Sequence, residues 1–369
     1  MSWNWQLPDW PHFHYDAEPI AQLEKQFLLG AGSAFACLKA ITEEERKKFI
    51  VEILSLEGQQ SSRIEGEILD RESLQSSLRK HFGLQPTVKK ETDKEARMAR
   101  LLSDVYESFD EPLTHEMLFR WHAMLFDNAR HIEDRGKYRT HSEPMQIVSN
   151  RQGSHHVFFE APPSAAVHRE MSAFIEWFNA PGSSILGRAA IAHLYFESIH
   201  PFEDGNGRIG RVLVEKLLSR AVGRPVLLAI SQVLEARKKE YYAGLELCNR
   251  TLNVQHWVEF FSESLIEAHE ESVRWLYFLM QKSKMMSLLA DKLNPRQIKA
   301  LLRMFSEGPN GFQGGMSAEK YIAITKTTRA TATRDLVQLV EMNVLNKTGE
   351  LKHTRYHLNL GAVTKFFDA

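Results

Sequence analysis

The sequence contains almost no cysteine and no long apolar run. Cys37 and Cys248 are its only cysteines, too few for a framework of disulfides or for a zinc site built from thiolates. No stretch approaches the ~20 apolar residues that span a bilayer, so no membrane partner is expected. Residues 1–5 lack the basic stretch and apolar core that open a secretory signal. These absences predict a cytoplasmic protein whose two thiols stay reduced.

Net charge is also nearly absent. The 46 lysines and arginines balance 47 aspartates and glutamates, which leaves a formal charge of −1. The chain as a whole therefore has no electrostatic preference for nucleic acid. Hydrophobic residues make up 43% and charged residues 25% of the 369 residues, proportions typical of a protein that buries a substantial core. A chain of this length is expected to form two or three domains.

Apolar residues recur with helical spacing through most of the chain, which predicts a mainly α fold. Helices are expected within residues 16–57, 71–82, 94–126, 167–179, 188–199, 209–221 and 254–289. Residues 145–159 differ, because two short β-rich runs flank a polar turn, as in a β-hairpin. The predicted domains are an N-terminal helical region (1–95), a helical core with the hairpin (96–290) and a C-terminal domain (291–369).

The C-terminal domain has the element order of a winged helix. Three helices are expected at residues 295–305, 317–322 and 328–342, followed by short strands at 345–347 and 356–358. From residue 295 onward, 11 lysines and arginines outnumber 6 aspartates and glutamates. Lys326, Arg329 and Arg334 lie near the expected recognition helix, so contact with DNA is one interpretation. The excess of positive charge is modest, and docking to a partner protein or a structural role is the other interpretation.

Residues 200–211, His-Pro-Phe-Glu-Asp-Gly-Asn-Gly-Arg-Ile-Gly-Arg, combine the features of an anion site. The run lies between two helical segments, and the second is expected to open at Ile209. Before it, Gly205, Asn206 and Gly207 tolerate left-handed backbone angles, which let successive N–H groups converge on an anion. The amino end of the following helix also favours negative charge.

The charged members of this run suit chemistry on a nucleotide phosphate. Arg208 and Arg211 are three residues apart, so both can face the site from the first helical turn, and guanidinium groups match phosphate oxygens. Asp204 is a hard carboxylate suited to Mg²⁺. His200 can transfer a proton near neutral pH. Together these groups are the components needed for attack on a phosphate.

Two other interpretations explain less of the run. Gly205, Gly207 and Gly210 have the Gly-x-Gly-x-x-Gly spacing of a dinucleotide-binding loop, but that loop follows a buried strand. Here a helical segment precedes the glycines. A polar connection between two helices, without any chemistry, is the remaining alternative.

The run resembles, at every specified position, the signature HxFx(D/E)GNGRxxR of the Fic family of protein AMP-transferases. The resemblance implies a helical Fic core with a β-hairpin flap, which transfers AMP from ATP to a Tyr, Ser or Thr hydroxyl of a target protein. By this resemblance His200 is the base that takes the proton of the hydroxyl, Phe202 anchors the loop, and Asp204 binds Mg²⁺. A homodimer is also implied.

The same resemblance assigns the contacts with the phosphates of ATP. Gly205, Asn206 and Gly207 resemble the family's anion hole. Arg208 and Arg211 resemble the clamps of the β- and γ-phosphates.

Two further stretches resemble parts of the family. Tyr242 and Asn249 resemble the adenine side of the nucleotide pocket, and a spacing of two helical turns places the ring and the amide on one face. Ordinary packing is the alternative for a tyrosine pair on a helix. The hairpin at 145–159 resembles the flap, which pairs with the backbone of the target by strand addition. Its apolar positions could equally belong to a strand core.

Residues 61–66, Ser-Ser-Arg-Ile-Glu-Gly, resemble the family's inhibitory motif (S/T)xxxE(G/N). The carboxylate of Glu65 can pair with Arg211 and so occupy the clamp of the γ-phosphate, and Ser61 stands at the (S/T) position of that motif. A helix cap, with Ser61 at the N-cap position and Glu65 one turn into the helix, is one alternative. In another, Glu65 positions water for the removal of AMP from a modified target.

The opening residues Trp3, Trp5 and Trp10 resemble an N-terminal segment of some bacterial Fic proteins. We interpret them as packing residues without a separate activity. A rival hypothesis for the whole chain is a DNA-binding regulator that uses the Fic core as a nucleotide sensor. That hypothesis gives the base His200 no task.

Overall fold

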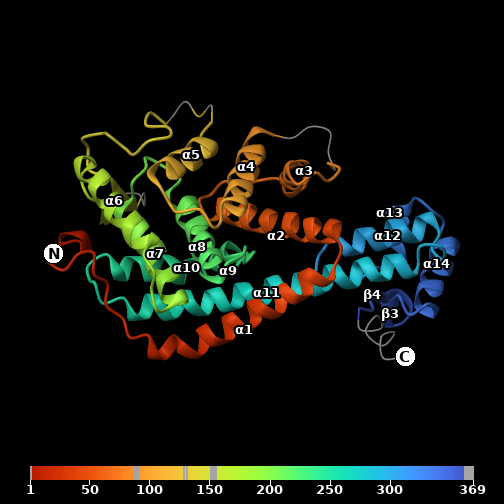
Figure 1. The fold of residues 1–369 in the computed structure, drawn as a ribbon. Coiled ribbons are helices and arrows are strands. Elements are labelled where there is room, and N and C mark those ends of the chain that lie inside the picture. Colours follow the sequence, from red (N-terminus) through yellow and green to blue (C-terminus); the bar gives the residue numbers. More distant parts are fainter. Residues whose placement is uncertain (1, 87–91, 128, 130–131, 150–155, 361–369) are drawn as a thin grey trace. The chain divides into compact units, whose positions relative to one another are not determined.

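The computed structural model describes residues 2–86, 92–127, 129, 132–149 and 156–360, and these are mainly α-helical, as predicted (Figure 1). The helices are α1 (Glu18–Ala40), α2 (Glu43–Ile64), α3 (Arg71–His81), α4 (Asp93–Glu107), α5 (His115–Leu125), α6 (Ser164–Asn179), α7 (Ile185–Ile199), α8 (Asn206–Val222), α9 (Ile230–Ala236), α10 (Lys238–Cys248), α11 (Gln255–Leu288), α12 (Pro295–Phe305), α13 (Ala318–Thr325) and α14 (Arg329–Glu341). Among the described residues, no helix combines the length and the apolarity that crossing a bilayer requires.

The strands form two antiparallel hairpins. They are β1 (Gln146–Ser149) with β2 (His156–Glu160), and β3 (Leu345–Thr348) with β4 (Arg355–Leu358). Two short 3₁₀ segments, η1 (Asn4–Gln6) and η2 (Leu351–His353), complete the elements. The hairpin predicted over 145–159 is confirmed in its two strands, while its turn at residues 150–155 lies outside the described residues.

The chain divides into two compact units. One contains Met1–Cys37 with Ile50–Ser272, and the other contains Leu38–Phe49 with Val273–Ala369. All residues predicted to act on the nucleotide lie in the first unit. The three-part division at residues 95 and 290 stays a prediction.

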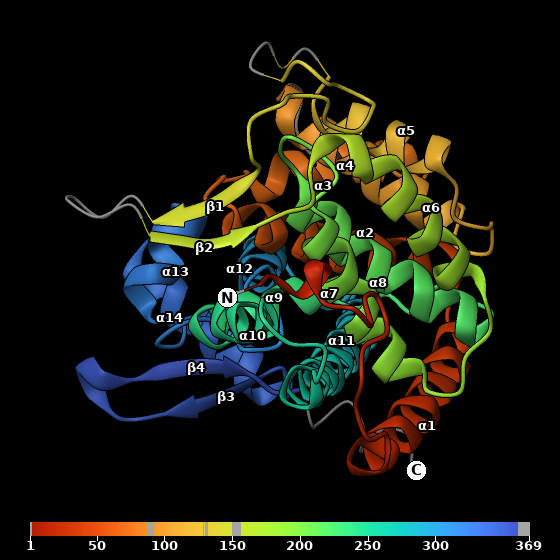
Figure 2. The ribbon, with the colours of Figure 1, turned by 90° about the vertical axis from the view of Figure 1, so that its left-hand side faces the viewer.

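The core of the first unit is built around α7 and α8, which pack against each other (Figures 1 and 2). Helix α7 is buried on almost every face, as is typical of a helix that other elements surround. Helix α6 covers part of it, and Trp257 of α11 donates its indole N–H to the Ala190 carbonyl at 2.8 Å. The ends of α7 and α8 are therefore firmly placed, and residues 200–205 connect them.

Helix boundaries follow the local chemistry of the sequence. The stretch predicted over 94–126 is interrupted between α4 and α5, where Pro112 lacks a donor and the Thr114 side chain caps α5 by accepting from the Met117 N–H. Helix α8 ends at Gly223 with a left-handed φ of 75°, as the stop signal predicted. Helix α2 runs on to Ile64, so Ser61 lies in its last turn, and the alternative of Ser61 as the N-cap of a helix is wrong.

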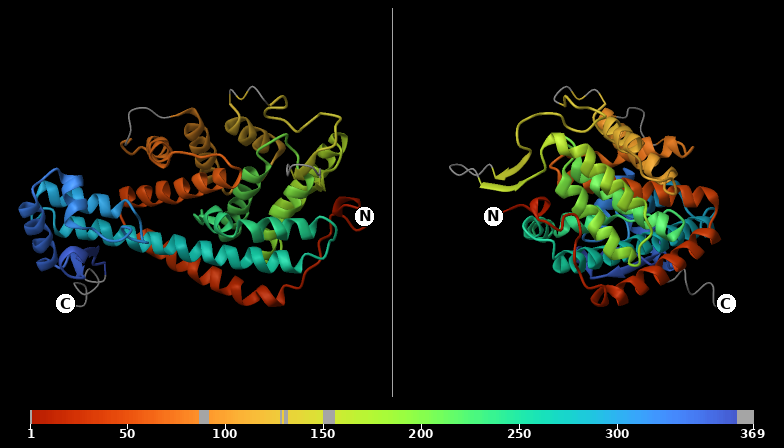
Figure 3. Two further views of the ribbon diagram at one scale, coloured as in Figure 1. Left: turned by 180° about the vertical axis from the view of Figure 1, so that it is seen from behind. Right: turned by 60° about the vertical axis from the view of Figure 1, so that its left-hand side comes forward.

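The second unit contains the elements predicted for the C-terminal domain, in the predicted order: α12, α13, α14 and the β3–β4 hairpin (Figure 3). Asp335 is buried among the helices, where Arg296, Tyr321 and Asn294 donate hydrogen bonds to it. Three helices followed by a two-stranded hairpin agree with a winged helix in element order. Membership in that fold class stays a prediction.

Candidate active site

The loop between α7 and α8 begins with a left-handed residue and ends with another. His200 has φ 49° and Gly205 has φ 81°. The expectation of left-handed angles at Asn206 and Gly207 is wrong, because α8 begins at Asn206 and both residues belong to its first turn. The helix therefore starts three residues earlier than predicted. Its amino end, which favours anions, comes correspondingly closer to His200.

Asn206 and Gly207 each have a specific local task. The Asn206 side chain accepts from the Phe202 N–H at 3.0 Å and donates to the Phe202 carbonyl at 2.9 Å, which closes the loop on itself. A side chain at Gly207 would collide with the carboxylate of Glu65. The glycine thus permits the close approach of Glu65 to the helix end.

Phe202 anchors the loop in the core. It is fully buried and stacks on the ring of His122, with centroids 4.2 Å apart and planes 6° apart. Burial lowers the pKa of His122 to about 4, so this ring stays neutral at physiological pH. The contact explains why an aromatic residue precedes the glycines.

Arg139 holds the strained beginning of the loop. Its guanidinium donates from Nε to the His200 carbonyl at 2.9 Å, from Nη1 to Ser164 Oγ at 2.9 Å and from Nη2 to the Pro162 carbonyl at 2.5 Å. Its backbone N–H donates to the Pro201 carbonyl at 3.0 Å. A left-handed non-glycine residue persists only where its surroundings impose it, and Arg139 supplies that constraint at His200.

His200 faces a cavity with its imidazole largely buried. Its Nδ1 lies 3.8 Å from Glu197 Oε2, on the preceding turn of α7. Burial and the nearby Arg139 lower the pKa of His200 to about 4, against the opposing effects of Glu197, Glu65 and Asp204. The imidazole is therefore neutral near pH 7 and able to accept a proton.

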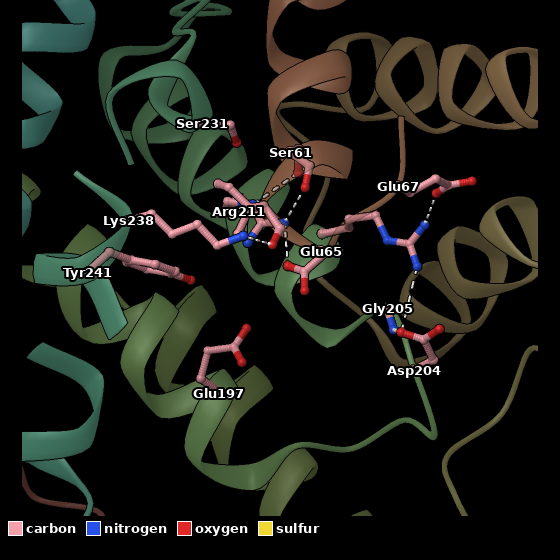
Figure 4. A network of polar contacts seen from close by, with 12 residues as sticks. Ser61, Glu65, Glu67, Glu197, Asp204, Gly205, Arg211, Ser231, Lys238 and Tyr241 are labelled. Carbon is pink, nitrogen blue, oxygen red and sulfur yellow. Dashed lines mark hydrogen bonds and ion pairs between the residues drawn. The ribbon is translucent and has the colours of Figure 1, made fainter. Parts of the chain in front are cut away.

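Glu197 is a buried carboxyl beside this histidine. Burial, together with the charge of Glu65, raises the pKa of Glu197 to about 8, although Arg211 acts in the opposite direction. The side chain is therefore largely protonated at neutral pH. It places a neutral acid, and no second negative charge, beside His200. Figure 4 shows Glu197 on the same side of the network as Glu65.

Arg211 lies at the centre of a network that joins α8 to the end of α2 (Figure 4). Its side chain is 0% exposed. Its Nε donates to Ser61 Oγ at 2.9 Å, and its Nη2 donates to the Ser61 carbonyl at 2.9 Å and to Glu65 Oε1 at 2.7 Å. Although burial favours the neutral acid, Arg211 holds the pKa of Glu65 below its ordinary value. The predicted pairing of Glu65 with Arg211 is thus present.

Arg208 pairs with a second carboxylate from the same segment. Its Nη1 lies 2.9 Å from Glu67 Oε2, and its Nη2 lies 3.6 Å from Asp204 Oδ1. The guanidinium also lies over the ring of Phe126 at 5.1 Å. Both arginines of the motif are therefore neutralised by acids that follow each other closely at the end of α2.

Asp204 is the exposed carboxylate of the loop, with 50% of its side chain accessible. Its Oδ1 accepts from the Gly205 N–H at 2.5 Å. Among the described residues, no group of three or more His, Cys, Asp or Glu side chains could hold a metal on its own. A single accessible carboxylate fits Mg²⁺, which commonly binds one or two carboxylates together with the phosphates of a substrate.

The predicted site residues gather around one cavity of about 670 Å³, a volume in the usual range of small-molecule sites. The predicted residues that line it are Glu65, His200, Asp204, Gly205, Asn206, Gly207, Tyr242 and Asn249. Ser61, Arg208 and Arg211 are not among the lining residues. They lie behind Glu65 and Glu67 in the network described above.

The far end of the cavity is lined by α10 and the β1–β2 hairpin. Tyr242 is 43% exposed, which leaves its ring available to a planar group. Asn249 donates from Nδ2 to the Phe158 carbonyl of β2 at 3.0 Å. Ile147 and Val148 of β1 also line the cavity and are about as exposed as Tyr242. A pocket between a helix and the edge of a hairpin can accept both a small ligand and an extended peptide.

Part of the chain matches a known protein family. The sequence profile of the Fic/DOC family matches residues 112–218, which contain the whole His200–Arg211 run. The chain contains a Fic domain. A profile described as a domain of unknown function, DUF4172, matches residues 3–84 and therefore includes Glu65 and Glu67.

Named relatives share the Fic domain. A protein adenylyltransferase Fic of Drosophila virilis is 30% identical over 172 residues, which are 46% of this chain and 31% of that protein. The Drosophila melanogaster protein of the same name is 33% identical over 127 residues, 33% of this chain and 25% of that protein. The matches thus span a third or less of those relatives.

Solved structures share the fold at low identity. A Fic family protein from Desulfovibrio desulfuricans G20 superposes with a TM-score of 0.55 at 21% identity, over 94% of this chain and 97% of that chain. A Fic domain containing signaling protein from Bacteroides thetaiotaomicron has a TM-score of 0.52 at 22% identity, over 67% and 96% of the two chains. These likenesses establish the fold.

Three residues at the site carry little signal in a single sequence. Arg139, Glu197 and Glu67 lie outside the His200–Arg211 run, and their side chains are ordinary in composition. Glu197 gives the clearest hint, because it lies one helical turn before His200. Glu67 lies two residues after Glu65, and its partner Arg208 is far away in sequence.

Proposed function

We propose that this chain is a protein AMP-transferase, which moves AMP from ATP to a side-chain hydroxyl of a target protein. The observation that supports it best is the meeting of three groups at one cavity: His200, Asp204 and the amino end of α8. A neutral imidazole, a metal-binding carboxylate and an anion-binding helix end are the groups that phosphoryl transfer requires. The relatives named protein adenylyltransferase agree with this proposal.

In the proposed reaction His200 acts as the general base. The oxygen of the target hydroxyl attacks the α-phosphorus of ATP while His200 accepts the hydroxyl proton. The bond between the α-phosphorus and the oxygen bridging to the β-phosphate breaks, and pyrophosphate leaves. The neutral state of His200 at pH 7 suits this role, because a protonated imidazole could not accept the proton.

The phosphates would lie at the amino end of α8. The backbone around Gly205, Asn206 and Gly207 would bind their oxygens, and Asp204 would hold Mg²⁺. When bound, Mg²⁺ would neutralise charge on the phosphates. Tyr242 and Asn249 would line the adenine end, where the exposed ring can stack on a base.

The same site contains its own inhibitor in our proposal. The γ-phosphate needs Arg211, and Glu65 occupies this guanidinium together with Ser61. Arg208 is occupied by Glu67 in the same way. ATP could then bind only in a pose that leaves the α-phosphate out of line, so the wild-type chain would transfer AMP slowly.

One alternative uses the same groups in the opposite direction. Glu65 lines the cavity beside His200, so its carboxylate could orient a water molecule toward the phosphate of an AMP-modified target. The chain would then remove AMP. DNA binding by the second unit, in which Lys326, Arg329 and Arg334 are exposed, stays a prediction, as does a homodimer.

The test is an incubation with ATP labelled at the α-phosphate. Wild type, Glu65→Gly and Glu65→Gly combined with His200→Ala are compared, each alone and with a cell lysate. We expect label on protein with Glu65→Gly, little with wild type and none with the double variant. Label that persists without His200, or its absence from all three proteins, would contradict the proposal.

A further inference from the structure

The first residues of the chain form a small hub beside the cavity. In the segment η1, Asn4 is 0% exposed. Its backbone N–H donates to the Asn249 carbonyl at 2.8 Å. Its side chain donates from Nδ2 to Ser198 Oγ at 2.9 Å and accepts from the Trp5 N–H at 2.7 Å. One buried residue thus links α7 to the end of α10, through its side chain and its backbone.

The two tryptophans beside Asn4 contact the flap strand β2. Trp3 packs edge-on against Phe159, with centroids 5.5 Å apart, and lies under the guanidinium of Arg250 at 3.1 Å. Trp5 donates its indole N–H to the Glu160 carbonyl at 2.7 Å. Trp3, Phe159 and Ala161 form a separate buried cluster, against which Trp5 also packs.

Every element held by this hub borders the cavity. Ser198 and Asn249, which accept hydrogen bonds from Asn4, are both lining residues, and so are Phe158 and Phe159 of β2. Asn249 completes the connection, because its Nδ2 donates to the Phe158 carbonyl. A shift of the hub would therefore move the hairpin and the α10 end of the cavity together.

We propose that Trp3, Asn4 and Trp5 are positioning residues, which set the distance between strand β2 and the Asn249 end of the cavity. This gives a task to part of the region that matches a domain of unknown function. A binding surface that is held in place before the ligand arrives loses less entropy on binding. Loss of the hub should therefore weaken the binding of ATP and of the target strand, and leave the proton transfer at His200 intact.

Three single variants test the proposal in the full-length Glu65→Gly protein. Asn4→Ala removes the link between Ser198 and the Trp5 N–H. Trp5→Phe keeps a ring but removes the indole donor to Glu160. Trp10→Phe is the matched control, because Trp10 donates its indole N–H to the Glu170 side chain at 2.9 Å and is not a lining residue.

The first readout does not depend on activity. Hydrogen exchange is followed at residues 156–160 and 245–249, and the affinity for a non-transferable ATP analogue is measured by calorimetry. We expect Asn4→Ala and Trp5→Phe to accelerate exchange in both segments and to weaken the affinity about 2- to 10-fold, the equivalent of one neutral hydrogen bond. Trp10→Phe should change neither quantity.

The second readout is kinetic and rests on the proposed function. We expect the KM for ATP to rise by a similar factor while kcat falls less than about twofold, since the reacting groups are unchanged. Unchanged exchange and affinity in both variants would overturn the inference, and so would equal changes in the control. If no AMP transfer occurs at all, exchange and affinity still test the hub, so the two proposals fail separately.

Discussion

The replacement of Glu65 by glycine has two effects that can be calculated from the structure. The first is a loss of stability, because the buried Arg211 loses its nearest counter-charge while its bonds to Ser61 remain. Hydrogen bonds to charged groups contribute about 1.5–3 kcal/mol. Since Glu65 is 30% exposed, the lower part of that range applies, and we expect the variant to be about 1.5–2 kcal/mol less stable.

The second effect is on the binding of ATP. With Glu65 absent, the γ-phosphate can take its place beside Arg211, and the affinity should rise at least about tenfold. At a nucleotide concentration equal to the Kd of the wild type, a tenfold tighter complex gains about 1.4 kcal/mol of stability, against about 0.4 kcal/mol for the wild type. Mg²⁺ and a non-transferable ATP analogue should therefore offset most of the stability that Glu65→Gly loses, while the wild type gains little.

Urea unfolding with and without the analogue measures both effects. Arg63→Ala is the control, because Arg63 lies two residues from Glu65 and pairs at 3.2 Å with Glu235, away from Arg211. This variant should respond to the analogue as the wild type does. The reasoning would be refuted if the analogue stabilised wild type and Glu65→Gly equally.

Three further predictions follow from neighbouring contacts. Glu67→Gln frees Arg208, so it should change stability by less than about 1 kcal/mol yet tighten the binding of ATP, which calorimetry measures. An unchanged affinity would show that Glu67 does not compete with ATP for Arg208. In Glu197, burial raises the folded pKa to about 8 from 4.5, so this carboxyl stabilises the fold at low pH and loses that contribution as pH rises toward 8. From pH 5 to pH 8, the free energy of unfolding of Glu197→Gln should therefore rise relative to that of the wild type by up to about 1.4 kcal/mol per pH unit. Urea unfolding at the two pH values measures this difference, and a difference that stays constant would argue against the buried acid. Arg139→Lys cannot reproduce the planar fork that holds the His200 carbonyl, so kcat should fall about tenfold or more with an unchanged circular dichroism spectrum; full activity would contradict its positioning task.

Much of the site could be predicted because its chemistry is contiguous. The residues from His200 to Arg211 follow one another along a helix end, where spacing alone determines which groups face the same point. The pairing of Glu65 with Arg211 could be predicted for another reason. A buried guanidinium requires a partner, and the only guidance to that partner was the resemblance of residues 61–66 to a known motif.

The remaining residues could not be predicted because their role depends on packing between distant segments. Arg139 reaches the His200 carbonyl from a segment 61 residues earlier, and Asn4 reaches Ser198 over 194 residues. The neighbouring sequence does not distinguish such a buried arginine or asparagine from one that is exposed to solvent. The tryptophans at the amino end were expected to serve packing alone, and their indole N–H and ring contacts with β2 appear only in the folded chain.

The backbone predictions failed at positions where tertiary contacts override local preference. Glycine and asparagine at 205–207 permit left-handed angles, but Asn206 closes the loop onto Phe202 and α8 extends back to include it. Ser61 is a good helix start by composition. In the structure its hydroxyl accepts from Arg211 inside the last turn of α2.

The most direct test of the central claim is a paired labelling of the Glu65→Gly protein. One sample receives ATP labelled at the α-phosphate and the other receives ATP labelled at the γ-phosphate, each with Mg²⁺ and a cell lysate. Relative to a Glu65→Gly, His200→Ala sample in the same lysate, transfer of AMP predicts that protein gains α-label and no γ-label, because the γ-phosphate leaves in pyrophosphate. Retention of the γ-label, or of neither label, would contradict the account.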